Sequence, residues 1–512
     1  MKLKKFLPFT LAILLASCGG GGVSSSSEPA SSEPAPSSSS EPASSSEPSS
    51  SEPPSSSAER DPVKIEFMSN TSYGDNIDSF IAAFQKIYPW IEVTNTKESA
   101  DYQGVVDKVI SGIPANNYPD IVSGYPDAFE GIMEAGKLVK LDKYINDPVI
   151  GWSEEDLEDI IETYLEEGQK YPIPGTYSLP FSKSTEALFY NKDVIIGLDL
   201  HTIDPTINNG DPLNEDYIND LTWEELFDKL CPAIVAYNET LPADSKILKD
   251  SDTYSKAVFG YDSDDNLFIT LAESYGYPYT SINDMGEGSI DFVNDGMKGL
   301  MKKFHEYYEK GYLVTKGTAK DGKYTNYSFT AEAALFTVGS TGGLKYQVCN
   351  SFETAIAPLP HPEGKPRKVI SQGPSIAILN HGDPNRVEAA WLFSKFITNP
   401  ENSLVWAVNT GYLPIRYSVS ESSAYRAPID AGLEADVHSL EHLQALCSQY
   451  IGDHTFVGDC LFGNPVFKGS AVARKQVGGL ATTIIGMSAD KFSDDAVNEA
   501  FETAKSNTLK AM

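Results

Sequence analysis

The order of apolar and polar residues beyond position 60 alternates between the pattern of a strand and the pattern of a helix. Apolar residues cluster over 63–68, 91–93 and 120–122, which predicts three short strands. Between these strands, apolar residues recur at helical spacing over 77–87 and 105–110, which predicts two helices that each bury one face. Strand–helix–strand repetition predicts an α/β fold whose sheet is covered by helices on both faces.

The middle and later parts of the chain are more helical. Thr222 and Glu225 have the spacing of a capping box and predict a helix that continues through Ala236. Two further amphipathic helices are predicted over 297–308 and 387–397. Their apolar stripes are typical of faces buried in a protein core and indicate no cofactor.

The first eighteen residues have the pattern of an export signal. Lys2, Lys4 and Lys5 precede a short apolar run over 6–16, which is too short to cross a hydrocarbon core of about 30 Å. The run ends in Leu15-Ala16-Ser17-Cys18, which resembles the lipobox of bacterial lipoproteins and predicts lipidation of Cys18. An ordinary secretory signal with an incidental cysteine is the alternative.

Residues 19–60 predict a disordered tether. The segment is almost entirely Gly, Ser, Pro, Ala and Glu, with Ser-Ser-Glu-Pro repeated, and its first basic residue is Arg60. It contains too little apolar surface to offset the entropy of ordering. A flexible chain of this length spans roughly 35 Å. We therefore expect a body that is lipid-anchored to the cell membrane and faces the outside.

The size and charge of the remaining chain limit its class. About 450 residues from Asp61 onward are too many for one core and predict two domains. The formal net charge of the whole chain is −33, which argues against nucleic acid as a partner because a phosphate backbone needs a basic surface. The same acidity means that an anion site would depend on a few local arginines and backbone N–H groups.

Four cysteines follow Cys18, and an exported protein permits disulfides between them. They allow three pairings, of which Cys447–Cys460 is favoured by its short separation; buried thiols are the alternative. The same region holds a set of residue types that zinc prefers, namely His438, His442, Cys447, His454 and Cys460. A surface helix explains these histidines equally well, and we predict no metal site.

Sequence motifs favour binding over catalysis. The chain contains no phosphate loop, dinucleotide-binding glycine motif, nucleophile elbow or His-Glu-x-x-His motif. The segment Gly339–Lys345 resembles a phosphate loop, but its lysine is misplaced. The 72 acidic residues offer many carboxylate pairs without distinguishing one. We therefore predict a protein that is not an enzyme and needs no cofactor.

Four motifs occur in the order typical of the solute-binding lipoproteins of bacterial ABC importers (family 1), which take up sugars and glycerol-3-phosphate. They are Tyr177-Ser178-Leu179-Pro180-Phe181 with Ser184-Thr185 and Tyr190-Asn191-Lys192-Asp193, then Leu221–Leu226, Ala355–Pro360 and Asn409–Ile415. This resemblance implies a type II periplasmic-binding-protein-like fold, with two hinged α/β lobes and a ligand cleft between them. The lobe boundaries implied are 61–172 plus 369–411 for the N-terminal lobe, and 173–368 plus 412–512 for the C-terminal lobe.

Within this family, the glycerol-3-phosphate-binding members are the most similar. Their ligand contacts fall on six positions of this chain: Tyr102, Ser184, Ser340, Gly373, Tyr412 and Arg474. The chain departs from the family where a glutamate is expected after Tyr125, because Pro126 stands there and Asp127 follows. The exact ligand therefore stays open.

Two ligand chemistries fit these residues. A phosphate would use Arg474 and the donors of Ser340–Gly343, whereas a neutral sugar would stack on Tyr275, Tyr277 or Trp223. Purely structural roles for Ser184, Gly373, Tyr412 and Arg474 are the alternative.

The function implied is that of a monomeric substrate-binding component, which captures a small polyol phosphate or carbohydrate and delivers it to an ABC permease. A surface-anchored glycan-degrading enzyme and a binding protein for a neutral oligosaccharide are the alternatives.

Overall fold

The computed structural model describes residues 60–512 except 71–73, 100 and 453. Arg60–Met512 form one compact unit that contains two separate five-stranded sheets. The predicted signal (1–18), the lipidation site Cys18 and nearly all of the tether (19–60) lie outside the described residues.

The first sheet is built mainly from the N-terminal part of the chain. Its strand order is β2-β1-β3-β13-β4, where β1 pairs in parallel with β2 and β3, and β13 pairs antiparallel with β3 and β4. In chain order the strands are β1 (Val63–Asn70), β2 (Ile91–Glu98), β3 (Ile121–Gly124), β4 (Leu179–Pro180) and β13 (Ser375–Ile378).

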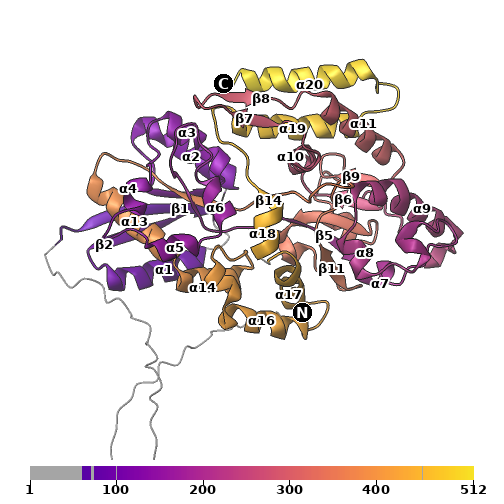
Figure 1. The fold of residues 1–512 in the computed structure, drawn as a ribbon, viewed down its shortest axis with the longest axis horizontal. Coiled ribbons are helices and arrows are strands. Elements are labelled where there is room, and N and C mark those ends of the chain that lie inside the picture. The colour runs from indigo at the N-terminus through magenta and orange to yellow at the C-terminus, as the bar shows by residue number, and fades with distance from the viewer. Residues whose placement is uncertain (1–59, 71–73, 100, 453) are drawn as a thin grey trace, which may run out of the picture. The chain divides into compact units, whose positions relative to one another are not determined.

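Helices cover both faces of this sheet, as the sequence predicts. Phe67 packs in a core with α1 (Gly74–Ile87) and α13 (Pro384–Ile397), while its neighbour Met68 packs with α2 (Tyr102–Gly112) on the other side. The reason is the twofold periodicity of a strand, which points successive side chains to opposite faces. In Figure 1, α2 and α3 lie above β1 and β2, and α1 lies below them.

The second sheet has the strand order β11-β5-β10-β6-β9. Strand β5 pairs antiparallel with β10 and β11, whereas β6 pairs in parallel with β10 and β9. The strands are β5 (Glu186–Asn191), β6 (Phe259–Tyr261), β9 (Leu313–Thr315), β10 (Phe336–Ser340) and β11 (Thr354–Ala357). Two small pairs complete the strands: β7 (Thr280–Ile282) with β8 (Gly288–Ile290), and β12 (Val369–Ile370) with β14 (Leu461–Phe462).

The second sheet is also covered on both faces. Leu188 and Tyr190 belong to a core that includes residues of α10 (Asp264–Tyr275), α11 (Asp295–Glu309) and α19 (Ser470–Ile485). Ala187 and Phe189 point the other way, into a core with α17 (Leu440–Tyr450). Figure 1 shows α10 and α19 above this sheet and α17 below it. The predicted α/β fold with two sheet-centred lobes is confirmed.

The remaining helices are mostly short and connect or flank the two sheets. They are α3 (Glu130–Glu134), α4 (Asp142–Ile145), α5 (Glu154–Glu158), α6 (Glu162–Glu167), α7 (Lys192–Ile195), α8 (Glu215–Asn219), α9 (Cys231–Thr240), α12 (Asn326–Thr330), α14 (Pro400–Thr410), α15 (Tyr417–Glu421), α16 (Ser423–Leu433), α18 (His454–Cys460) and α20 (Asp494–Leu509). One half of the predicted capping box is present, since the Glu225 N–H donates to Thr222 Oγ1 over 3.0 Å. Within the described residues, no helix has the length and apolar character needed to cross a membrane.

The predicted disulfide between Cys447 and Cys460 is wrong. All four cysteines of the described residues are free, and Cys447 is buried in the core beneath α17. Burial raises the pKa of the Cys447 thiol to about 12, so it remains protonated.

The chain passes between the two sheets in three adjacent segments. Lys183 forms a bridge with Leu413, and Ser184 forms one with Gln372, so the three segments are held together by backbone hydrogen bonds. The resemblance implies that the first segment of the N-terminal lobe ends at residue 172. Strand β4, which follows this residue, nevertheless pairs within the first sheet. The lobe boundaries given above stay a prediction.

A buried ion pair fixes one of these segments. Lys183, which is fully buried, donates from Nζ to Glu167 Oε2 over 2.6 Å, and the Glu167 side chain is 6% exposed. The Lys183 ammonium also lies 5.5 Å from the ring centroid of Tyr164. Each of these two charges has lost its hydration, and the attraction of the other charge offsets that cost.

We expect Lys183→Met to lower the free energy of unfolding by about 3–5 kcal/mol, because it leaves Glu167 buried without its counter-ion. The double substitution Lys183→Met with Glu167→Leu should recover most of this loss. Urea unfolding of the three proteins measures the difference. A single variant as stable as the double variant would contradict the expectation.

Candidate functional site

Three tyrosines from distant parts of the chain meet where elements of the first sheet end. Tyr102 begins α2, Tyr125 follows β3, and Tyr412 follows α14. The hydroxyl oxygens of Tyr102 and Tyr412 are 3.3 Å apart, and the rings of Tyr102 and Tyr125 meet edge to face at 5.7 Å. Burial raises the pKa of Tyr125, so its hydroxyl stays neutral. The group offers aromatic surface and neutral hydroxyls.

Gly373 lies beside this group for a backbone reason. Its φ of +87° is in the left-handed region, and a Cβ at this position would stand 1.9 Å from the Ser182 carbonyl oxygen. Glycine is therefore required. The Gly373 N–H donates to the hydroxyl of Tyr125, and its neighbour Gln372 forms two backbone hydrogen bonds with Ser184.

Ser340 comes from the second sheet. It ends β10 and caps the short helix η7 (Thr341–Tyr346), with its Oγ accepting from the Gly342 N–H over 3.2 Å. A Cβ added to Gly342 would lie 3.3 Å from the ring of Tyr412, so this loop contacts the tyrosine group. One N–H of the predicted anion-binding segment is thus already engaged by Ser340.

Arg474, on α19, joins residues associated with both sheets. Its Nε donates to Asp127 Oδ2 over 2.9 Å, and its Nη1 donates to Asp265 Oδ2 over 3.1 Å and to Asn266 Oδ1 over 2.6 Å. Asp127 follows β3 of the first sheet, whereas Asp265 and Asn266 begin α10 beside the second sheet. The Arg474 side chain is 27% exposed, so it is partly shielded from solvent.

The charges of this group stabilise one another against burial. Burial acts to raise the pKa of Asp265, but the charge of Arg474 and the hydrogen bonds from Ser263 and Arg474 together outweigh it and hold the carboxyl pKa below its usual value. Burial likewise opposes the charge of Arg474, yet Asp127 and Asp265 raise the pKa of the guanidinium. Asp265 and Arg474 are therefore ionised at neutral pH.

Glu186 extends this network into the protein. It is the first residue of β5 and is buried, and its carboxyl group accepts from Asn266 Nδ2 over 2.9 Å and from the Tyr261 hydroxyl over 2.5 Å. Burial raises its pKa to about 8. The sequence analysis did not identify Glu186, although a charged residue directly after Ser184-Thr185 in an otherwise apolar strand was a usable signal.

The structure brings the six predicted site residues into one neighbourhood. Tyr102 contacts both Tyr125 and Tyr412, and Gly373 lies beside Tyr125, while Ser184, which is buried, and Ser340 adjoin this group through backbone segments. Arg474 is close enough for its charge to lower the pKa of Tyr125. Whether these residues bind a ligand stays a prediction.

Three aromatic residues were candidates for stacking on a sugar, and the prediction is wrong for Trp223. It is 2% exposed and packs against Phe227, Phe259 and Phe304 in the core of the second sheet. Tyr275 donates its hydroxyl hydrogen to Glu224 over 2.8 Å.

Tyr277 lines a cavity of about 640 Å³ together with Tyr279, Thr280, Lys170 and Asn464. Burial raises the pKa of Tyr279, and Arg474 is near enough for its charge to oppose this effect. None of the six predicted residues lines this cavity. Its size is in the range of small-molecule sites.

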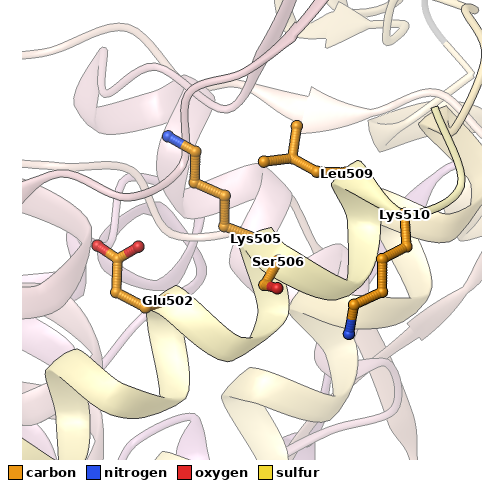
Figure 2. Close-up of a pocket in the computed structure, with 5 residues that line it drawn as sticks. All are labelled: Glu502, Lys505, Ser506, Leu509 and Lys510. Carbon is orange, nitrogen blue, oxygen red and sulfur yellow. The ribbon is translucent and has the colours of Figure 1, made fainter.

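A second hollow, of about 370 Å³, lies on α20 and does not resemble a built site. Figure 2 shows that its five lining side chains project from this one helix. None of the six predicted residues lines it. Across the described ranges, no group of three or more His, Cys, Asp and Glu side chains is arranged to hold a metal ion.

The raised pKa of Glu186 predicts a pH-dependent stability. The pKa of Glu186 is about 8 in the folded protein and 4.5 in the reference state. Between these two pH values, the folded protein therefore binds more protons than the unfolded chain. Stability is therefore lost as the pH rises from about 5 to about 8, by at most about 1.4 kcal/mol per pH unit. Glu186→Gln should reduce this dependence, which urea unfolding at the two pH values measures. The exposed Glu309→Gln is the control with the same charge change, and equal slopes for both variants would contradict the assignment.

Comparison with known proteins gives the family. Residues 79–432, more than half of the chain, match the family described as bacterial extracellular solute-binding protein. The sn-glycerol-3-phosphate-binding periplasmic protein UgpB of Salmonella typhimurium (strain LT2) is 21% identical over 380 residues, which cover 72% of this chain and 78% of that protein. UgpB of Escherichia coli K12 is 21% identical over 352 residues, covering 67% and 71% respectively.

Solved structures agree on the fold. UgpB from Mycobacterium tuberculosis in complex with glycerophosphocholine superposes with a TM-score of 0.62 at 18% identity, covering 88% of this chain and 98% of that one. The cyclic alpha-maltosyl-1,6-maltose binding protein from Arthrobacter globiformis gives 0.61 at 17% identity, covering 88% and 99%. The resemblance inferred from the four sequence motifs is confirmed. The chain belongs to the family of bacterial extracellular solute-binding proteins.

Proposed function

We propose that this protein is the monomeric substrate-binding component of an ABC importer, which captures a small polyol phosphate or carbohydrate and delivers it to a membrane permease. The observation that carries the proposal is the convergence of six residues, which the family resemblance implied from distant parts of the sequence, on one neighbourhood that draws on elements of both sheets. Family membership supports the same reading.

The chemical groups at the site support reversible binding of a ligand that is not chemically converted. The site offers hydroxyls, carboxylates, one guanidinium and aromatic faces, which are the groups that recognise polyols and sugars through hydrogen bonds and C–H contacts. A ligand that touches Tyr125 on one side and Ser340 on the other would bridge both sheets. It would stabilise the arrangement in which these contacts form, and a permease would recognise that arrangement.

A ligand screen tests the proposal. We expect the melting temperature of the protein to rise with a member of a panel of sugars, polyols, glycerol phosphates and glycerophosphodiesters, and the ligand to be recovered chemically unaltered by NMR. Tyr102→Ala should weaken binding of that ligand by at least about tenfold, because it removes an aromatic face and a hydroxyl. The exposed Tyr324→Ala is the matched control. Conversion of the ligand to a product would favour the alternative of a glycan-degrading enzyme.

We also propose that Cys18 is lipidated after cleavage of 1–18 and that 19–60 tethers the body to the outer face of the cell membrane. The proposal rests on the sequence, where the lysines, the apolar run and the lipobox-like residues follow one another.

Cys18→Ser should shift the protein from the membrane fraction to the soluble fraction of the expressing bacterium, because the acylated thiol is lost. Cell fractionation with immunoblotting measures the shift, and Ser25→Ala within the tether is the control. Retention of Cys18→Ser in the membrane fraction would contradict lipidation at this residue.

A further inference from the structure

The hydrogen bonds of Arg474 restrict the ligands that it can accept. A guanidinium binds a phosphate in two-pronged fashion through a pair of N–H groups on one edge, either Nε with Nη2 or Nη1 with Nη2. Here Nε donates to Asp127, and Nη1 donates to Asp265 and Asn266. One member of each such edge is therefore already engaged, and a two-pronged phosphate would have to displace a protein partner.

The negative charge around Arg474 also disfavours a phosphate ligand. Asp127 and Asp265 together outweigh the single positive charge of Arg474. A phosphate monoester brings a further charge of about −1.5 to −2 at neutral pH. Lys183 does not compensate, because it is fully buried and paired with Glu167. Lys170, which lines the cavity of about 640 Å³, donates from Nζ to the Gly463 carbonyl over 3.1 Å. An anionic ligand at Arg474 would thus meet net repulsion from this group of three charges.

An uncharged hydroxyl group fits the same arrangement without displacing any partner. Its oxygen can accept from Nη2 of Arg474, and its hydrogen can be donated to the carboxylate of Asp127 or Asp265. The tyrosines at 102, 125, 279 and 412 add aromatic faces for the C–H surface of a polyol or a sugar ring.

We propose that Asp127, acting with Asp265, is the specificity-determining residue of the site, and that it selects uncharged polyhydroxylated ligands (carbohydrates or polyols) over phosphate esters. The inference rests on the proposed function and narrows its ligand class. It also gives a role to the departure at 126–127, where the carboxylate stands one residue later than the family's glutamate and reaches the arginine.

Isothermal titration of the wild-type protein at neutral pH tests the selection directly. The uncharged probes are glycerol, glucose, maltose and maltotriose. The phosphorylated probes are the anions sn-glycerol 3-phosphate and glucose 6-phosphate and the zwitterion glycerophosphocholine. We expect an uncharged probe to bind at least roughly tenfold more tightly than each phosphorylated one. Tighter binding of a phosphate ester or phosphodiester overturns the inference but leaves the proposed function intact. Failure of every probe to bind overturns both.

Substitution of the carboxylates tests the role of Asp127. Asp127→Asn should raise the affinity for the phosphate esters by roughly tenfold and lower that for the uncharged ligand by a similar factor, because it removes one of the two negative charges beside Arg474 and replaces a charged hydrogen-bond acceptor with a weaker, neutral amide. Asp265→Asn should act in the same direction and provides a second variant if the first is poorly folded. The exposed Asp252→Asn controls for the change in net charge. Equal losses for both ligand classes in both site variants would overturn the specificity role.

Discussion

One guanidinium holds together residues that lie far apart in the sequence and belong to the surroundings of different sheets. Arg474 donates hydrogen bonds to Asp127 beside the first sheet and to Asp265 and Asn266 beside the second. Asn266 in turn donates a hydrogen bond to the buried Glu186. A buried or half-buried charge is stable only when its partners are in place. The position of each partner therefore depends on the others, and the tyrosine group is assembled around the same point.

This arrangement explains how the candidate site is assembled from residues whose local sequence says little about their partners. The residues that contact one another come from the ends of strands and helices, where backbone geometry already fixes their direction. Gly373 is held by its close approach to Ser182, and Ser340 by its cap on η7. The chain crosses between the sheets in three adjacent segments, so movement of one sheet against the other would change all of these contacts together.

Local periodicity made much of the fold predictable. The strand at 63–68 and the helices at 77–87, 105–110, 297–308 and 387–397 all appear, because burial of one face or of alternate side chains leaves a regular pattern in the sequence. Contacts between residues that are distant in the sequence leave no such pattern. Asp265 and Asn266 look like an ordinary polar helix start, and the short separation of Cys447 and Cys460 says nothing about the directions of their side chains.

The predicted site residues came together because the motifs that suggested them are local, while their partners are not. The role expected for Arg474 as a phosphate ligand changes once Asp127 and Asp265 are seen beside it, since more than two hundred residues separate the arginine from either carboxylate. Trp223 shows the opposite case: a large aromatic residue near a helix start proved to be part of a buried aromatic cluster.

The four unpaired thiols have a consequence for how this protein is made and handled. Its architecture draws no stability from covalent cross-links in the described residues, so folding needs neither an oxidant nor an isomerase that shuffles bonds between sulfurs. Reducing and oxidising surroundings should leave the same native state, whose durability then depends wholly on packing, hydrogen bonding and charge.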